Sequence, residues 1–178
     1  MQLIPVILRG LQAIFASIVL GICVNLARGQ HTEWDRVPAA TSYAAFCGGF
    51  GALVAVVGFA SIFRPSLDGI ITWTLDGLSA VTMLAAGIAY VVLMRDTPCG
   101  DSYSVFVNPL LNCGCVRNKA EQLCACSIEE GKGRCISAKA GSAFMFISCA
   151  TCLGIVGYSF CVRRRGVGGV AGERVTYA

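Results

Sequence analysis

The sequence predicts an all-α membrane protein: a four-helix transmembrane bundle with a disulfide-rich extracellular loop between the third and fourth helices. Composition is the first reason. The 178 residues are 56% apolar and only 13% charged, with a mean hydropathy of +0.69, whereas a soluble domain carries about 25% charged residues. The other two reasons are four long apolar runs and a loop that holds six of the eleven cysteines.

Each apolar run reaches the roughly 20 residues that a helix needs to cross a hydrocarbon core of about 30 Å. Backbone amides in lipid must be paired within the segment, so we expect helices rather than strands. The first run lacks a basic leading segment and a small-residue cleavage site, and we interpret it as a retained helix. The expected helices cover about residues 5–27, 39–63, 69–94 and 138–162.

The loop over residues 95–137 contains Cys99, Cys113, Cys115, Cys124, Cys126 and Cys135. An even number of cysteines in such a loop is typical of a disulfide framework in an oxidising compartment. The alternative is a cytosolic zinc knuckle, but Cys-x-Cys is an uncommon chelating spacing and the loop has no histidine. We therefore expect disulfides and no metal, with the loop outside. Cys99 follows the third helix and Cys135 precedes the fourth, so a bond between them would close the base of the loop.

The spacing of the four inner cysteines predicts how they pair. In an extended strand, residues i and i+2 point to the same face. Two strands folded back on each other would place Cys113 opposite Cys126 and Cys115 opposite Cys124. The separation between such partners suits a disulfide, so we expect these two nested bonds.

The tetraspan domain is expected to cover residues 1–162. Both termini lie on one side because the number of spans is even, and we expect that side to be the cytoplasm because the Cys-rich loop is expected outside. A glycine-containing tail over 163–178 should be flexible. The basic block Arg163, Arg164 and Arg165 follows the fourth span directly, as is typical of the cytoplasmic side, and should contact anionic lipid. Cys161, beside this block, is a candidate for palmitoylation, the alternative being a simple packing residue.

Besides Lys139 at the edge of the fourth span, two charges lie well inside the expected spans, where an unpaired charge costs about 2.5–3.5 kcal/mol. Arg9 lies ~6 Å along the first helix and Asp76 ~10 Å along the third, and both helices start from the same face. This similar depth predicts an ion pair between them. A proton or ion relay is the alternative, but the four spans supply no second acid; Arg9 could also extend to lipid phosphate.

Several function classes find no support in the sequence. The one histidine, His31, lies in a short loop beside acidic residues, and no hydrolase, metalloprotease or phosphate-binding motif occurs. We expect no enzymatic activity and no cofactor, although phospholipid, sphingolipid or sterol could be bound. No basic run is interleaved with aromatic residues, so nucleic acid is not an expected partner. Many glycines and alanines in the helices predict close helix packing, without a wide pore, and contacts with lipids, neighbouring membrane proteins or further copies of the chain.

Three features of the sequence are found together in one known family: Arg9 in the first helix, Asp76 within the stretch Thr74-Leu75-Asp76-Gly77 of the third, and a loop bounded by Cys99 and Cys135. In these features the chain resembles MARVEL-domain tetraspan proteins. It is most similar to the fungal non-classical export or eisosome-associated branch, although the four inner cysteines depart from the pattern of that branch. The resemblance also suggests the Cys99–Cys135 bond. It implies a plasma-membrane protein that organises lipid and protein microdomains, responds to sphingolipid or sterol content, and self-associates.

Two other classes remain open at this point. An adhesion protein similar to tetraspanins or claudins would bind a partner through the Cys-rich loop, but the first outer loop is too short for a claudin and has no cysteine pair. A small channel or transporter would need a continuous polar path past Asp76. A dry bundle with lipid in lateral grooves would favour the organiser.

Overall fold

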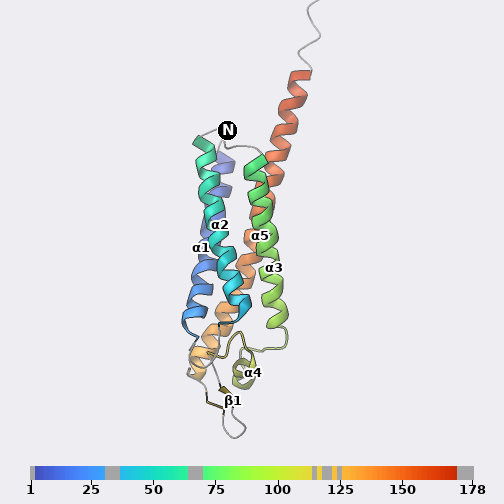
Figure 1. Ribbon diagram of the computed structural model, residues 1–178. Coiled ribbons are helices and arrows are strands. Elements are labelled where there is room, and N and C mark those ends of the chain that lie inside the picture. Colours follow the sequence, from blue (N-terminus) through green and yellow to red (C-terminus); the bar gives the residue numbers. More distant parts are fainter. Residues whose placement is uncertain are drawn as a thin grey trace, which may run out of the picture.

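Four long helices form an antiparallel bundle in the computed structural model, which describes residues 3–30, 37–63, 70–113, 116–117, 122–123 and 126–171 (Figure 1). The helices are α1 (Leu3–Arg28), α2 (Ala39–Phe63), α3 (Ile70–Leu93) and α5 (Ile128–Ala171). Each contains a stretch that is long and apolar enough to cross a membrane: Ile4–Arg28, Ala39–Ser61, Ile70–Leu93 and Ile128–Val162. The predicted four-helix transmembrane fold is confirmed.

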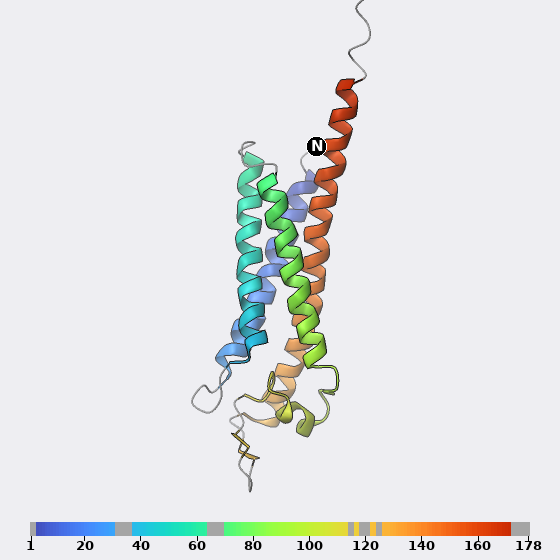
Figure 2. The same cartoon turned by 45° about the vertical axis from the view of Figure 1, so that its right-hand side comes forward.

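The helices form a ring in which α1 packs against α2 and α5, and α3 packs against the same two neighbours. α1 and α3 therefore face each other diagonally across the centre of the bundle. Figure 2, turned by 45°, shows α2 and α3 at the front with α1 and α5 behind them. A side chain that joins α1 to α3 must cross the core of the bundle.

The buried residues of α1 and the turn after it are spaced alternately by three and four positions. This spacing is that of left-handed helix packing, in which one face of each helix stays directed at its neighbours. In chain order these residues are Arg9, Gln12, Ala16, Val19, Cys23, Leu26 and Gln30. The first two and the last are polar, and those between them are apolar. The buried face of α1 therefore has an inner polar layer near its start, an apolar middle, and an outer polar layer at the cap end.

Glycine allows α1 and α2 to approach backbone to backbone. A Cβ atom added at Gly48 would lie 2.7 Å from the amide nitrogen of Leu20 and 2.9 Å from its Cα. Any larger side chain would separate the two helices, which is the use of small residues that the sequence predicted. Large apolar side chains face outward instead, among them Ile14, Leu53 and Val81, each more than half exposed. Such a surface suits hydrocarbon rather than water.

A compact cap covers the end of the bundle where α3 stops. It contains the short helix α4 (Ser102–Val107) and an antiparallel pair of two-residue strands, β1 (Val116–Arg117) and β2 (Gln122–Leu123). Asp101 caps α4 by accepting hydrogen bonds from the backbone amide of Tyr103 and the hydroxyl of Ser104. The Ser104 hydroxyl holds the pKa of the exposed Asp101 carboxyl below its usual value.

The fourth membrane helix is longer than predicted at both ends. It begins at Ile128 rather than 138, so Cys135 lies inside α5 and the loop between the third and fourth helices is shorter than 95–137. The cause is a capping box: the Ser127 hydroxyl accepts from the amide of Glu130, and the Glu130 carboxylate accepts from the amide of Ser127. These bonds satisfy amides that would otherwise be unpaired at the start of a helix.

The other end of α5 reaches into the tail expected over 163–178, whose flexibility remains a prediction. The helix continues to Ala171, so the first nine residues of that tail are helical. Helix elongation adds one hydrogen bond for each residue fixed, once nucleation has occurred, so a stable span can extend into a sequence that would not form a helix alone. Residues 172–178 lie outside the described part of the chain.

Candidate functional site

Arg9 and Asp76 form an ion pair across the diagonal of the bundle. Arg9 Nη1 donates to Asp76 Oδ1 at 2.6 Å, and Nη2 donates to Oδ2 at 2.7 Å. The arginine is 6% exposed and the aspartate 0%. The structure therefore brings together the two charges whose similar depth suggested a pair. Two parallel hydrogen bonds between a guanidinium and a carboxylate fix orientation as well as charge.

The other two helices also contribute to this inner charge cluster, which we define as Arg9, Gln12, Asp76, Gly58 and Cys152. Gln12 accepts from Arg9 Nη1 at 3.1 Å and donates to Asp76 Oδ1 at 3.2 Å and to the Cys152 sulfur of α5 at 3.3 Å. Gly58 of α2 faces the guanidinium: a Cβ atom there would lie 2.4 Å from Arg9 Cζ and Nε. The guanidinium thus occupies the space that a side chain at position 58 would fill.

This cluster is suited to fixing helix positions rather than to moving protons. Both charges are neutralised at short range, and Asp76 accepts three hydrogen bonds from two side chains. A proton relay needs a chain of groups that exchange protons, and the bonds of Asp76 hold its carboxylate against a guanidinium and an amide, neither of which takes up a proton from it. Removing one partner of a buried pair costs about 3–5 kcal/mol, because the other charge is left uncompensated.

Apolar residues separate the inner charge cluster from the opposite end of the core. Moving along α1, the next buried positions are Ala16, Val19 and Cys23, and the facing positions of α3 are Met83 and Ala86. All of these residues are fully or almost fully buried. Among the described residues, this middle part of the core contains no charged side chain, although it also buries the hydroxyl groups of Ser79, Ser148 and Tyr90. Its mainly apolar lining argues against a continuous path for ions through the bundle.

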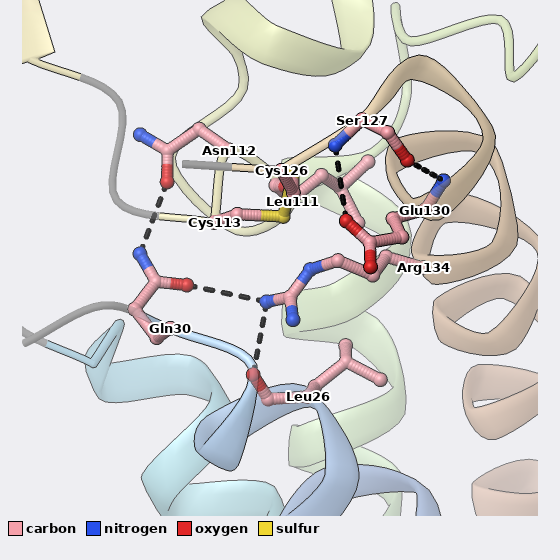
Figure 3. Close-up of a disulfide and its surroundings, with 9 residues drawn as sticks. All are labelled: Leu26, Gln30, Leu111, Asn112, Cys113, Cys126, Ser127, Glu130 and Arg134. Carbon is pink, nitrogen blue, oxygen red and sulfur yellow. Dashed lines mark hydrogen bonds between the residues drawn. A yellow bond between two sulfur atoms is a disulfide. The ribbon is translucent and has the colours of Figure 1, made fainter. Parts of the chain in front are cut away.

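A second polar network lies at the cap end and was not predicted from the sequence. Arg134 of α5 donates through Nη2 to the carbonyl of Leu26 at 2.9 Å and to Gln30 Oε1 at 3.2 Å, and Gln30 Nε2 donates to Asn112 Oδ1 at 3.0 Å (Figure 3). Leu26 belongs to the last turn of α1, where carbonyl groups lack helical partners and a cation is favourable. This outer polar network joins α1, α5 and the cap.

Arg134 resembles Arg9 in one further respect, because each guanidinium lies against a glycine. A Cβ atom at Gly29 would come within van der Waals overlap of Arg134 Nη1. The Arg-Cys pair at 134–135 is visible in the sequence, but the partners of Arg134 come from the end of α1 and the turn after it. The one available signal was the Ser127-x-x-Glu130 capping pattern, which would have placed Arg134 inside a helix.

Two of the three expected disulfides lie in the described residues. Cys99 and Cys135 are bonded with a Cα separation of 5.6 Å, and Cys113 and Cys126 with a separation of 6.0 Å. Figure 3 shows the second bond next to Asn112, at the edge of the outer polar network. Because Cys113 and Cys126 are bonded to each other, they do not form the alternative zinc knuckle.

The Cys115–Cys124 bond falls outside the described residues. The strand register bears on it, since Val116 pairs with Leu123 and Arg117 with Gln122. These pairs have the register that the nested arrangement requires, so Cys115–Cys124 remains a prediction.

Of the remaining cysteines, Cys152 contacts the inner charge cluster through Gln12. Cys23, Cys47, Cys149 and Cys152 are buried free thiols, as expected of small packing residues, and Cys161 is an exposed thiol near the end of α5. Arg163, Arg164 and Arg165 are in α5, but their side chains lie outside the described part of the structure. Palmitoylation at Cys161 and lipid contact by the arginines remain predictions.

The fold and the two networks define a class: an integral membrane protein of four spans, held together by a central ion pair and closed on one side by a disulfide-bonded cap. The chain belongs to the MARVEL family, the membrane-associating domain, which it matches over residues 2–158. It is also similar to Non-classical export protein 2 of Saccharomyces cerevisiae, with 29% identity over 147 residues that cover 81% of this chain and 72% of that protein. No solved structure matches the chain. The resemblance drawn from the sequence is confirmed at the level of the family.

Proposed function

We propose that this chain is a plasma-membrane protein, without enzymatic activity, that organises lipid and protein microdomains, self-associates, and responds to sphingolipid or sterol content. The observation that carries the proposal is the contrast between the core and the surface of the bundle. Both membrane charges of the inner cluster are paired inside, whereas the outward faces of the helices carry large apolar side chains. The outward faces of the helices are thus suited to contact with lipid.

The two bonded cysteine pairs support the proposed orientation. Disulfides persist in oxidising compartments, so a cap that contains Cys99–Cys135 and Cys113–Cys126 belongs on the extracellular side. The termini are then cytoplasmic, and the basic block at 163–165 faces the leaflet that usually carries anionic lipid.

The name of the yeast relative refers to non-classical export, and a role in export is the second candidate for this chain. An organiser would affect export indirectly, through the composition of the membrane around other proteins. A conduit would act directly, but it would need a polar path where the described core has Val19, Met83 and Ala86. The mainly apolar middle of the bundle favours the indirect role.

The rigid cap supports a further possibility, in which a protein outside the cell binds to it. Two disulfides and the outer polar network fix the cap to the bundle, and rigid surfaces lose less entropy on binding. A chain in which the hairpin over 114–125 is replaced by a short Gly-Ser linker separates the two ideas. Membrane patches should survive this change if the bundle organises lipid, and should disappear if a partner of the cap creates them.

The main test is to image a fluorescently tagged full-length chain while sphingolipid synthesis is blocked, and then while sterol is extracted. We expect membrane patches that redistribute within the time needed to deplete the lipid. A uniform distribution that is indifferent to both treatments would contradict the proposal. A tagged Asp76→Asn variant serves as a control for the fold, because loss of surface expression would mark a folding defect rather than a change in lipid response.

A further inference from the structure

Two exposed lysines lie on one face of α5 at the cap end of the bundle. Lys132 and Lys139 are separated by seven positions, which is two helical turns, and the exposed Ile136 lies between them. Among the described residues, neither lysine has a carboxylate within ion-pair distance. The two ammonium groups therefore lack a protein counter-charge in the part of the chain that the structure describes.

The depth of Lys139 follows from the contacts of its neighbour. A Cβ atom at Gly141 would lie 3.3 Å from the side chain of Ile22, so these residues of antiparallel helices are level. At 1.5 Å per residue, the cap end of α1 lies about 9 Å beyond Ile22. On the antiparallel helix α5, Lys139 lies about 3 Å closer to the cap than Gly141. The Cα of Lys139 is thus about 6 Å inside the plane where α1 ends at Arg28.

A charge at this depth, on a face directed away from the bundle, must reach the headgroup layer. Helical side chains lean toward the N-terminus of their helix, and the N-terminus of α5 is at the cap. The long stem of Lys139 can extend along the apolar boundary and carry its ammonium outward. Lys132, two turns farther out, lies about 4 Å beyond the plane of the α1 end. Both charges are then directed at one lipid headgroup.

We propose that the Lys132–Ile136–Lys139 face of α5 binds the phosphate headgroup of an anionic phospholipid in the leaflet on the side of the cap. Lys139 contacts the phosphate, Lys132 contacts the outer part of the headgroup, and Ile136 packs against the start of an acyl chain. The site goes beyond the proposed microdomain role and does not depend on it, because it concerns one face of one helix. It is also distinct from the block at 163–165, which lies more than twenty residues farther along α5 toward the opposite leaflet.

A local fluorescence reporter tests this site. The full-length chain carries Ile136→Trp together with Trp34→Phe and Trp73→Phe, and is reconstituted into vesicles of phosphatidylcholine with a minor fraction of brominated lipid. Bromine quenches only a nearby tryptophan, so the basic block at the far end of α5 does not contribute. The measured quantity is the quenching by brominated phosphatidylglycerol divided by the quenching by brominated phosphatidylcholine at the same mole fraction.

We expect a quenching ratio that corresponds to about five-fold local enrichment of the anionic lipid. A basic residue at a membrane surface attracts anionic lipid by about 1 kcal/mol, and this free energy corresponds to about a five-fold change in local concentration. Lys139→Gln should bring the enrichment close to one, Lys132→Gln should lower it partly, and Lys139→Arg should preserve it. The matched control is Tyr43→Trp in the same background. Tyr43 is 39% exposed on α2, a helix without charged residues, about 6 Å from the cap end of that helix.

The control position should show no preference for the anionic lipid. Equal quenching by the two lipids at position 136, or an enrichment that is unchanged when both lysines are replaced by glutamine, would overturn the proposal. Both lysines are exposed and lack a partner among the described residues, so neither replacement should disturb folding. A circular dichroism spectrum and a thermal unfolding curve check this for each variant.

Discussion

Replacing Gly58 with alanine should destabilise the protein, although alanine is the better helix former. The added Cβ would lie 2.4 Å from Cζ and Nε of Arg9 and 2.6 Å from Nη1. An ordinary contact needs at least 3.4 Å, so the guanidinium would have to move by about 1 Å. Arg9 is held by two hydrogen bonds of 2.6 and 2.7 Å to Asp76, and a displacement of this size breaks their geometry.

The magnitude follows from two opposing effects. Removing one partner of a buried ion pair costs about 3–5 kcal/mol, and a displaced pair keeps part of its attraction, so this range is the upper limit of the cost. Replacing glycine by alanine within a helix gains about 1 kcal/mol. We therefore expect Gly58→Ala to lower the free energy of unfolding by at most about 2–4 kcal/mol. The assay is reversible unfolding of the purified chain in mixed detergent micelles, in which the fraction of a denaturing detergent is increased stepwise.

Gly49→Ala is the matched control, because no atom lies within 4 Å of the position where its Cβ would be. It should leave stability unchanged or raise it slightly. A second control removes the guanidinium and the carboxylate together, by Arg9→Met with Asp76→Leu, and in that background Gly58→Ala should no longer destabilise. If Gly58→Ala behaves like Gly49→Ala in the otherwise unchanged protein, the reasoning about the inner charge cluster is refuted.

Three further predictions concern the charges and the cap. Asp76→Asn should reduce stability and surface expression more than Gln12→Ala, because it leaves the buried arginine uncompensated; equal effects in an unfolding assay would contradict this. Mass spectrometry of non-reduced peptides should find a Cys115–Cys124 bond, and free thiols at both positions would exclude it. An NMR titration that follows the side-chain carboxyl carbon of Asp101 should give a pKa below the usual value for aspartate. The hydrogen bonds of Asp101 at the start of α4 should therefore stabilise the protein fully above the usual pKa, and less as the pH falls through the lowered pKa. A pKa at or above the usual value would contradict these hydrogen bonds.

Hydrophobicity alone was sufficient to predict the spans of the bundle. The predicted range 39–63 coincides with α2, since this run contains no charge and is bounded by Pro38 and Arg64. The start of α5 was predicted ten residues too late, because Glu129, Glu130, Lys132 and Arg134 interrupt the apolar pattern. At that point the capping box, rather than burial, determines where the helix begins.

The candidate site was predictable only in part. Arg9 and Asp76 could be paired from the sequence because a membrane penalises lone charges and their depths are similar. The role of Gly58 depends on how α2 is rotated toward α1, which the many small residues of α2 leave open. The outer polar network joins Arg134 to Gln30, which continues the buried spacing of α1, and Gln30 to Asn112 in the cap. Periodicity places Gln30 on the buried face but carries no information about its partners.

The central claim, that this protein organises lipid through the surface of its bundle, is tested most directly with purified components. The full-length chain is labelled for energy transfer between copies and reconstituted into vesicles at a fixed ratio of protein to lipid, while the sphingolipid fraction is increased. We expect energy transfer between protein copies, and between protein and labelled sphingolipid, to rise above random mixing as that fraction grows. Energy transfer that stays at the value for randomly mixed monomers at every composition would contradict the claim.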